Sequence, residues 1–202
     1  MKYLNSRNWI VMMSKNVLSY NLTTKFTTPK SPFNTLRTDA SSVCITKKDA
    51  IILGGYIQQD EKPLQQIEAT SIVERYDTDS NTWKKLRNLN IGRASCAAAV
   101  LNGKVFVFGG YMNINTTVDT CEFMNLSDGH WTLLTKKVPH PLGETSACCL
   151  ENHIVVYGAQ MHLFNREEGK LFLFTPEIQR WKEIHKKHQN ALHEAASVFI
   201  LQ

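Results

Sequence analysis

The densest group of side chains that could bind a metal or catalyse a reaction lies near the C-terminal end of the sequence. Its members are His185, His188, His193 and Glu194. Imidazole and carboxylate groups at close spacing can bind zinc or transfer protons, but the H-E-x-x-H pattern of zinc proteases is absent. In register with the repeats described below, this segment is an outer strand followed by a loop. We therefore predict a solvated loop there and no metal or catalytic site.

Two carboxylates in the segment YDTDSNTW, Asp77 and Asp79, are a second candidate for acid–base chemistry. Aspartate, asparagine and serine in such a cluster hydrogen-bond their own backbone, so we interpret this segment as a turn between two strands. The G-x-S-x-G pattern of serine hydrolases is absent from the sequence. The sequence thus predicts no catalytic residue, no cofactor and no metal.

Five cysteines could in principle form disulfides or hold a metal. Their number is odd and no two of them form C-x-x-C, which argues against a disulfide framework and against a zinc site. Cys44 and Cys148 each stand ten residues before the first small residue of a repeated pair, Gly54 and Gly158. We interpret both as small apolar residues at one shared position of a buried strand.

The stretch KVFVFGGY, residues 104–111, sets a strand-forming run against two adjacent glycines and an aromatic residue. A phosphate-binding loop would need G-x-G-x-x-G, or Gly-Lys-Ser/Thr opening a helix, and neither pattern follows. The same arrangement occurs at Gly54–Gly55 and, as Gly158–Ala159, in a third copy, with steps of 55 and 49 residues. The glycines therefore mark an internal repeat.

Tryptophans keep the same period, because Trp83, Trp131 and Trp181 are 48 and 50 residues apart. Between each glycine pair and its tryptophan lies one more apolar segment: SIVERYD, TCEFMN and KLFLFTP. A period near fifty residues with four short strands per unit is typical of β-propeller blades.

Composition places the chain among ordinary globular proteins, since 43% of its 202 residues are hydrophobic and 20% are charged. No run approaches the length of a transmembrane helix, and polar residues interrupt the N-terminal segment MKYLNSRNWIVMM, which is a poor signal peptide. We therefore expect a cytoplasmic protein that does not contact a membrane.

The net charge of +5 raises the question of nucleic-acid binding. Lysine pairs at 84–85, 136–137 and 186–187 each follow a repeat tryptophan, where the outermost strand of a blade would lie. Lysine on exposed edge strands prevents pairing with other chains, and no RNA-binding signature accompanies these pairs. We therefore expect no nucleic-acid partner.

The strands of one repeat can be placed from turn chemistry. Residues ASCAAAVL and KVFVF flank Asn102–Gly103, a dipeptide that favours a type I′ hairpin turn. Alanine is a poor strand former, so a strand built of alanines fits only where space is tight, as near the axis of a propeller. We predict small residues in the innermost strand of each blade and tryptophan in the outermost.

Arg93, the segment ASCAAAVLNGKVFVFGGY and the segment ERYDTDSNTW together resemble the kelch repeat, with its double glycine, Tyr-Asp pair and tryptophan at characteristic spacing. The resemblance covers about residues 37–184 and implies an all-β, kelch-type β-propeller of about three full blades. It divides the chain into a degenerate partial repeat at 1–33, repeats at 37–89, 90–137 and 138–187, and the first strand of a further repeat at 190–202.

The two ends of the chain complement each other. From Trp9 the chain offers the second to fourth strands of a blade, with Phe26 in the place of the tryptophan, and EAASVFILQ offers a first strand. Joined, they would form a fourth blade and close a ring without free edges. Kelch-family propellers usually have five to seven blades, so a piece of a longer propeller is the alternative. We favour the piece, because repeat arrays need capping at exposed ends.

The resemblance also implies where a partner would bind. In kelch propellers that bind peptide degrons, contacts come from the residue after the double glycine and from the start of the first strand. The corresponding residues of this chain are Tyr56, Arg93, Ser95, Tyr111, Glu144 and Gln160. Tyrosine suits a peptide site because it offers a large amphipathic area at low entropic cost, although both tyrosines could equally pack the loops.

The function implied is a non-catalytic protein–protein interaction module with a protein or peptide ligand, similar to the substrate-recognition part of BTB-kelch adaptors for cullin ubiquitin ligases. Direct cullin recruitment is not expected without a BTB domain. One alternative is an actin-associated or cytoskeletal scaffold. A less favoured one is an enzyme related to the copper-radical oxidases, whose ligand pattern of Cys, Tyr and His cannot be assigned in this sequence.

Overall fold

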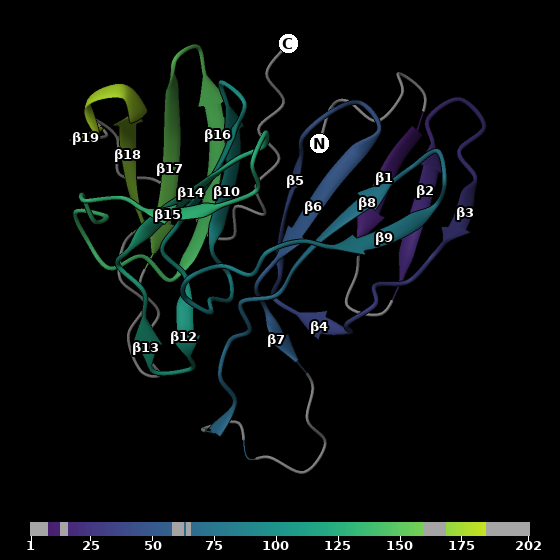
Figure 1. Cartoon of the computed structure of the whole chain (residues 1–202), viewed down its shortest axis with the longest axis horizontal. Coiled ribbons are helices and arrows are strands. Elements are labelled where there is room, and N and C mark those ends of the chain that lie inside the picture. The colour runs from purple at the N-terminus through teal and green to yellow at the C-terminus, as the bar shows by residue number, and fades with distance from the viewer. Residues whose placement is uncertain (1–7, 13–15, 58–62, 64–65, 160–168, 185–202) are drawn as a thin grey trace.

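A computed structural model of the chain describes residues 8–12, 16–57, 63, 66–159 and 169–184. Nearly all elements within these residues are antiparallel β-strands, which form three four-stranded sheets, one three-stranded sheet and two two-stranded sheets. Figure 1 shows the larger sheets side by side, with the N-terminal strands at one side of the molecule and the last strands at the other. The predicted all-β fold of four-stranded blades is confirmed.

In each four-stranded sheet the spatial order of the strands follows the sequence, as expected for a propeller blade. The first blade contains β5 (Ser41–Cys44), β6 (Asp49–Leu53), β8 (Val73–Asp77) and β9 (Thr82–Lys85). The second blade contains β10 (Ala97–Leu101), β11 (Lys104–Phe108), β14 (Cys121–Asn125) and β15 (Trp131–Leu133). The third blade contains β16 (Glu144–Leu150), β17 (His153–Ala159), β18 (Lys170–Thr175) and β19 (Arg180–Glu183), with the short 3-10 helix η2 (Pro176–Ile178) before β19.

The N-terminal sheet has the order β1 (Asn8–Met12), β2 (Val17–Asn21), β3 (Thr27–Lys30), and β1 has no strand on its other side among the described residues. The expectation for Phe26 is wrong, because this side chain is 75% exposed and Thr27 takes the register position opposite Tyr20 that a tryptophan holds in the first blade. Residues 190–202 lie outside the described residues, so the blade shared between the two ends stays a prediction.

The hairpin turns between the first two strands of each blade follow from local backbone chemistry. Asn102 and Gly103 both have positive φ angles, of 50° and 71°, as a type I′ turn requires, and Glu151 repeats this at 52° in the third blade. The turn fixes the register, in which Leu101 pairs with Lys104. The predicted hairpin at Asn102–Gly103 is confirmed.

The double glycines are required by the approach of the next blade. Gly55 and Gly110 have φ angles of 94° and 93°, which disfavour any side chain. The backbone N–H of Gly55 donates to the carbonyl of Arg93, and that of Gly110 donates to the carbonyl of Leu142, both at 2.9 Å. Each pair therefore joins its blade to the chain that enters the next one. The third copy ends in Ala159, and no further blade follows it among the described residues.

The hydrophobic core lies in three seams between neighbouring sheets. We call them the first seam (N-terminal sheet and first blade), the second seam (first and second blades) and the third seam (second and third blades). Alternate side chains of a strand point to opposite faces, so β11 sends Val105 and Val107 into the second seam and Phe106 and Phe108 into the third. Both faces of the first and second blades are therefore covered by a neighbouring sheet.

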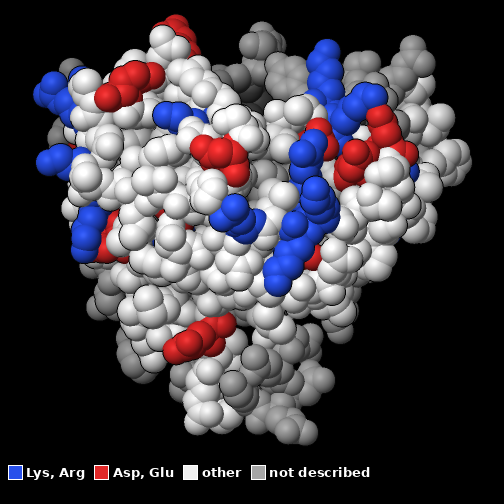
Figure 2. Space-filling model, in the orientation of Figure 1, with Lys and Arg blue, Asp and Glu red and all other residues white. Residues whose placement is uncertain are grey.

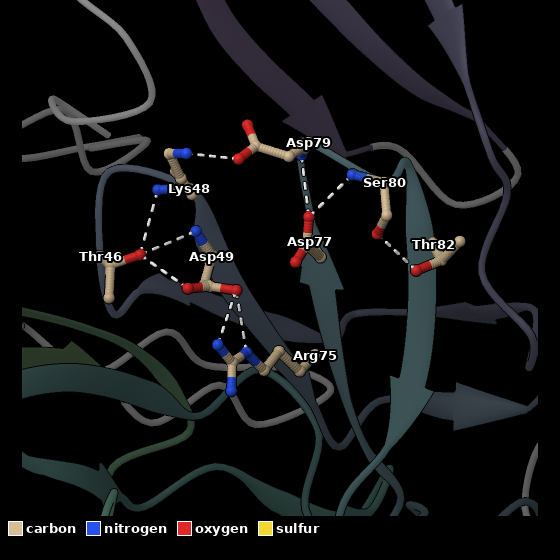
Figure 3. A network of polar contacts seen from close by, with 8 residues as sticks. All are labelled: Thr46, Lys48, Asp49, Arg75, Asp77, Asp79, Ser80 and Thr82. Carbon is tan, nitrogen blue, oxygen red and sulfur yellow. Dashed lines mark hydrogen bonds and ion pairs between the residues drawn. The ribbon is translucent and has the colours of Figure 1, made fainter.

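A polar network ties two turns of the first blade together (Figure 3). The Thr46 hydroxyl accepts hydrogen bonds from the backbone N–H groups of Lys48 and Asp49 and donates to the Asp49 carboxylate. Asp49 in turn accepts two hydrogen bonds from the Arg75 guanidinium, at 2.8 and 2.9 Å. Lys48 forms an ion pair with Asp79 in the turn between β8 and β9. We call this end of the blades, which carries the hairpin turns, the turn face.

Candidate functional site

The opposite end of the blades is more elaborate, and we call it the loop face. It carries the double glycines and two small sheets, in which β4 (Arg37–Thr38) pairs with β7 (Tyr56–Ile57) and β12 (Tyr111–Asn113) pairs with β13 (Thr116–Thr117). Both sheets project from the lower end of the molecule in Figure 1. The sequence-predicted site residues that the structure describes all belong to strands or connections at this face.

Tyr56 follows the first double glycine and lies in β7, where it pairs with Thr38 and forms a bridge with Ala69. Its side chain is half-buried. Burial, together with the charges of Asp39 and of Tyr111, raises the pKa of Tyr56 to about 12. Because Tyr56 pairs with Thr38, it lies beside Asp39, the next residue along the chain.

Tyr111 follows the second double glycine, at the start of β12, and it pairs with Ala94 through two backbone hydrogen bonds of 2.8 Å. Its hydroxyl lies over Gly143, because a Cβ atom added to this glycine would be 2.0 Å from it. Glu144 is the next residue along the chain, and it is exposed at the start of β16. Tyr111 thus connects the two segments that enter the second and third blades.

Ser95 is the link between the first strands of the three blades. It has a positive φ angle of 50°, and its backbone N–H donates to the carbonyl of Asp39 at 2.8 Å. Its own carbonyl accepts hydrogen bonds from the backbone N–H and the hydroxyl of Thr145, at 3.0 and 2.9 Å. These bonds hold Asp39, Ser95 and the start of β16 at fixed relative positions.

Arg93 does not belong to this surface. Its side chain is 0% exposed and forms an ion pair of 2.9 Å with Glu122, which is also 0% exposed. The guanidinium also donates to the carbonyls of Gly109 and Thr120 and to the Thr120 hydroxyl. Both terminal nitrogens are thus hydrogen-bonded in the interior of the second blade, whereas the buried Nε has no hydrogen-bond partner, and the side chain is out of reach of a binding partner.

The first blade repeats this arrangement with Arg37 and Glu74, whose atoms approach to 2.9 Å at 0% and 1% exposure. Burial lowers the pKa of Arg37, and Glu74 opposes this shift. The glutamates were missed in the sequence analysis, although they occupy the same position of the repeat as each other. In the third blade, the positions of Arg93 and Glu122 are held by the buried apolar residues Leu142 and Phe172.

The described site differs from the predicted one at two further positions, Gln160 and Asp39. Gln160 lies outside the described residues, so its place stays a prediction. Asp39 was not predicted, although it is exposed beside Tyr56 and holds the same repeat position as Ser95 and Glu144. The signal that could have found it is the alignment of the repeats on their arginines, because Asp39 follows Arg37 at the spacing at which Ser95 follows Arg93. The described site therefore contains Asp39, Tyr56, Ser95, Tyr111 and Glu144.

Chemically, this site offers two phenol rings, two carboxylates and ordered backbone groups. Asp39 and Glu144 are both exposed. No three His, Cys, Asp or Glu side chains gather as metal ligands in the described part of the chain, and the histidine group at 185–193 lies outside it. All five cysteines are free thiols, and burial raises the pKa of Cys121 to about 12. The described residues contain no helix long and apolar enough to cross a membrane.

Comparison with known proteins identifies relatives of this architecture. Residues 12–201 match the family described as the KLHDC2/KLHL20/DRC7 Kelch-repeats domain. Kelch-like protein 35 of Mus musculus is 30% identical over 113 residues, which are 55% of this chain and 18% of that protein. Kelch repeat protein M-T8 of Myxoma virus (strain Lausanne) is 31% identical over 93 residues, 46% of this chain and 18% of that protein.

The fold itself has a counterpart among solved structures. The structure of YjhT superposes with a TM-score of 0.76 and 14% sequence identity, over 93% of this chain and 65% of that one. The chain spans less than half the length of the curated relatives it matches.

Proposed function

Because this chain belongs to the kelch-repeat family, whose repeats are in general non-enzymatic interaction domains, we propose that it binds a protein or peptide partner through the loop face. Loops held on a rigid scaffold are where recognition residues concentrate. The site of Asp39, Tyr56, Ser95, Tyr111 and Glu144 joins loops of all three blades and has fixed backbone geometry.

The observation that carries the proposal is the pairing of tyrosines with carboxylates on one surface. Tyr56 and Tyr111 are half-buried, so part of each ring remains accessible to a ligand. Tyrosine is enriched at binding hot spots because it gives a large contact area at low entropic cost. Asp39 and Glu144 add negative charge, which complements a basic ligand. We therefore propose an extended peptide with lysine or arginine beside an apolar residue.

The experiment is a peptide-display selection on the purified chain, followed by affinity measurement of the enriched peptides. We expect lysine or arginine in the enriched sequences and a loss of affinity of about tenfold or more for Tyr56→Ala and for Tyr111→Ala. Tyr157→Ala is the matched control, because Tyr157 is also half-buried but lies in β17 of the third blade. Equal affinities for the three variants and the unchanged chain would contradict the proposal.

The finer proposal concerns the setting of this binding. We propose substrate recognition in a ubiquitin-ligase pathway, by the resemblance to adaptors of this family, and assign no cullin contact to the residues described. Five free thiols favour a reducing compartment such as the cytoplasm. Co-sedimentation with actin filaments separates this proposal from the cytoskeletal alternative, because a peptide-recognition module should remain in the supernatant.

A further inference from the structure

The second seam contains a cavity of about 220 Å³ close to the turn face. Its lining combines residues of the first and second blades, among them Ile51, Arg75, Arg87, Met124, Asp128 and Gly129. The floor is apolar and buried, since Ile51 is 0% exposed and Met124 is 2% exposed. This cavity is at the other end of the blades from the double glycines and is separate from the site proposed above.

The cavity exists because of differences between two equivalent seams. The positions of Ile51, Arg75 and Met124 in the repeat correspond to Phe106, Phe123 and Phe174 in the third seam. There the rings of Phe106 and Phe123 lie with centroids 5.8 Å apart, and those of Phe106 and Phe174 6.2 Å apart. Three phenylalanine rings thus occupy the volume that Ile51, Met124 and an Arg75 side chain bound to Asp49 leave open in the second seam.

A second difference opens the cavity at its turn-face end, which we call the mouth. Gln179 lies two residues before Trp181, and its side chain crosses the third seam to accept hydrogen bonds from the backbone N–H and hydroxyl of Thr135. The corresponding residue of the second seam is Gly129, around which a Cβ atom would meet nothing within 4 Å. The second seam is therefore open where the third is bridged, and a ligand group can enter from the turn face.

The size and lining of the cavity suit a buried aliphatic or aromatic side chain. Apolar protein cavities of about 150 Å³ bind benzene, so a cavity of about 220 Å³ accepts a leucine or a phenylalanine side chain. Filling it would also restore the packing contacts that its lining residues lack.

The charges around the mouth determine which residues of the ligand can flank the inserted side chain. Asp49 holds Arg75 at the rim (Figure 3), and Lys84 is the register partner of Arg75 on the same face of the sheet. Arg87 also lines the cavity. The one carboxylate of the lining, Asp128, already accepts hydrogen bonds from the backbone N–H of His130 and from Asn125.

The three basic side chains Arg75, Lys84 and Arg87 outnumber the two carboxylates beside them, Asp49 and Asp128, so the mouth is basic by one charge. Figure 2 shows Lys and Arg side chains in a column right of the centre of the view, near the part where Figure 1 draws β6, β8 and β9, with Asp and Glu side chains beside its upper part. An acidic ligand complements this surface.

We propose that this cavity is a second docking site, which takes one aliphatic side chain of a partner protein segment whose neighbouring residues are acidic. The apolar side chain enters between the first and second blades, and the flanking carboxylates pair with Lys84 and Arg87 at the rim. The site goes beyond the loop-face function, and it gives the module a second contact of opposite charge preference.

The test uses the full chain with methionine methyl groups labelled with ¹³C, titrated with the peptide Glu-Glu-Leu-Glu-Glu, acetylated and amidated at its ends. We expect the methyl signal of Met124 to shift, and the peptide with alanine in place of leucine to bind about tenfold more weakly, because apolar contact is lost. The peptide Lys-Lys-Leu-Lys-Lys should bind more weakly still, because the mouth is basic. Equal binding of the three peptides would overturn the assignment.

Two variants make the test specific. Met124→Phe copies the residue of the third seam and should abolish binding, whereas Met112→Phe, on the loop face, should leave it unchanged. Lys84→Glu changes only an exposed charge and should weaken binding about threefold or more at low salt, with the fold intact. Unchanged affinity in Lys84→Glu, or equal affinity of Met124→Phe and Met112→Phe, would show that the cavity is not the site.

Discussion

At the scale of single residues, the buried ion pairs distinguish two blades from the third. Arg37–Glu74 and Arg93–Glu122 are enclosed in the first and second blades, and Leu142 and Phe172 replace them in the third. A buried pair of charges is often no more stable than apolar residues of similar volume, but one charge without its partner is costly. The third blade therefore shows that two apolar residues can take the place of the buried ion pair.

This comparison predicts the stability of variants of the second pair. Arg93→Leu should lower the free energy of unfolding by about 3–5 kcal/mol, because it leaves Glu122 buried and unpaired. Arg93→Leu with Glu122→Phe copies the third blade and should recover most of that loss. Urea denaturation measures both, and Asp119→Asn, which breaks the exposed pair with Lys137, is the control at about 0–1 kcal/mol. A double variant no more stable than the single one would contradict the account.

A second prediction concerns acid stability at Asp77. Hydrogen bonds from the backbone N–H groups, chiefly that of Ser80 and also that of Asp79, lower the pKa of Asp77 in the folded chain. The unfolded chain therefore binds more protons on this group in acid, so its stabilising contribution is present above the ordinary aspartate pKa. That contribution is lost as the pH falls through the lower pKa of the folded state.

Asp77→Asn should keep the turn and lose this part of the pH dependence. Asn21 shows that the amide is sufficient, because its side chain accepts the same two kinds of hydrogen bond, from the backbone N–H groups of Thr23 and Thr24. Urea midpoints measured between pH 6 and pH 2.5 should fall less steeply for the variant than for the unchanged chain. Parallel curves would show that Asp77 does not titrate as described.

Residue types alone predicted part of the site. The tyrosines after the double glycines could be placed from the repeat, and the turn role of Asp77 followed from its neighbours. The burial of Arg93 could not be predicted, because it depends on Glu122, which comes from another strand 29 residues later. An arginine at the start of a strand gives no sign of its solvent exposure until its partner is known.

At the scale of elements, the double glycine allows two segments of the chain to pack closely against each other. A Cβ atom on Gly110 would lie 2.5 Å from the carbonyl oxygen of Ala94 and 2.8 Å from the Cβ of Cys96, whereas one on Gly103 would meet nothing within 4 Å. Both glycines have positive φ angles, so both substitutions carry backbone strain. Only the substitution of Gly110 also pushes two segments apart.

Gly103→Ala should therefore cost about 1 kcal/mol of stability from strain, and Gly110→Ala should cost clearly more. Thermal unfolding followed by calorimetry measures the difference, with Gly103→Ala as the control that isolates crowding from strain. Equal melting temperatures would mean that the close approach of Ala94 and Cys96 relaxes without cost.

The strands themselves were the most predictable elements. The double glycine, the turn at Asn102–Gly103 and the outer tryptophans fixed three blades in the sequence, because these features repeat with one period. The last strand of the N-terminal sheet was less predictable, since Phe26 was expected to pack as a tryptophan and is exposed. A single aromatic residue in a degenerate repeat can be displaced by one position, which moves its side chain to the other face of the strand.

At the scale of the whole molecule, ring closure depends on what covers the N-terminal sheet. The N-terminal sheet lacks a strand beside β1 among the described residues, while the other blades have four. The superposed structure of YjhT is larger, because this chain covers 65% of it. The sequence could predict blades but not ring closure, since a strand left over at each end fits both a closed ring and an open piece.

Hydrogen exchange can decide between these arrangements. The open piece, which we favour, predicts strong protection of β11, which is paired on both sides, and fast exchange of those amides of β1 that face away from β2. Mass spectrometry of the exchanging chain with peptide resolution checks this. Protection of β1 equal to that of β11 would show that another strand covers it, as the shared fourth blade requires.

The most direct measurement of the central claim is the exchange footprint of a selected peptide on this chain. Amides of the loop face, at Tyr56–Ile57 and Tyr111–Asn113, should exchange more slowly when the peptide is bound, while the turn-face residues 45–48 and 78–81 should be unchanged. Slower exchange confined to the turn face, or no change at either tyrosine, would contradict partner recognition through the loop face.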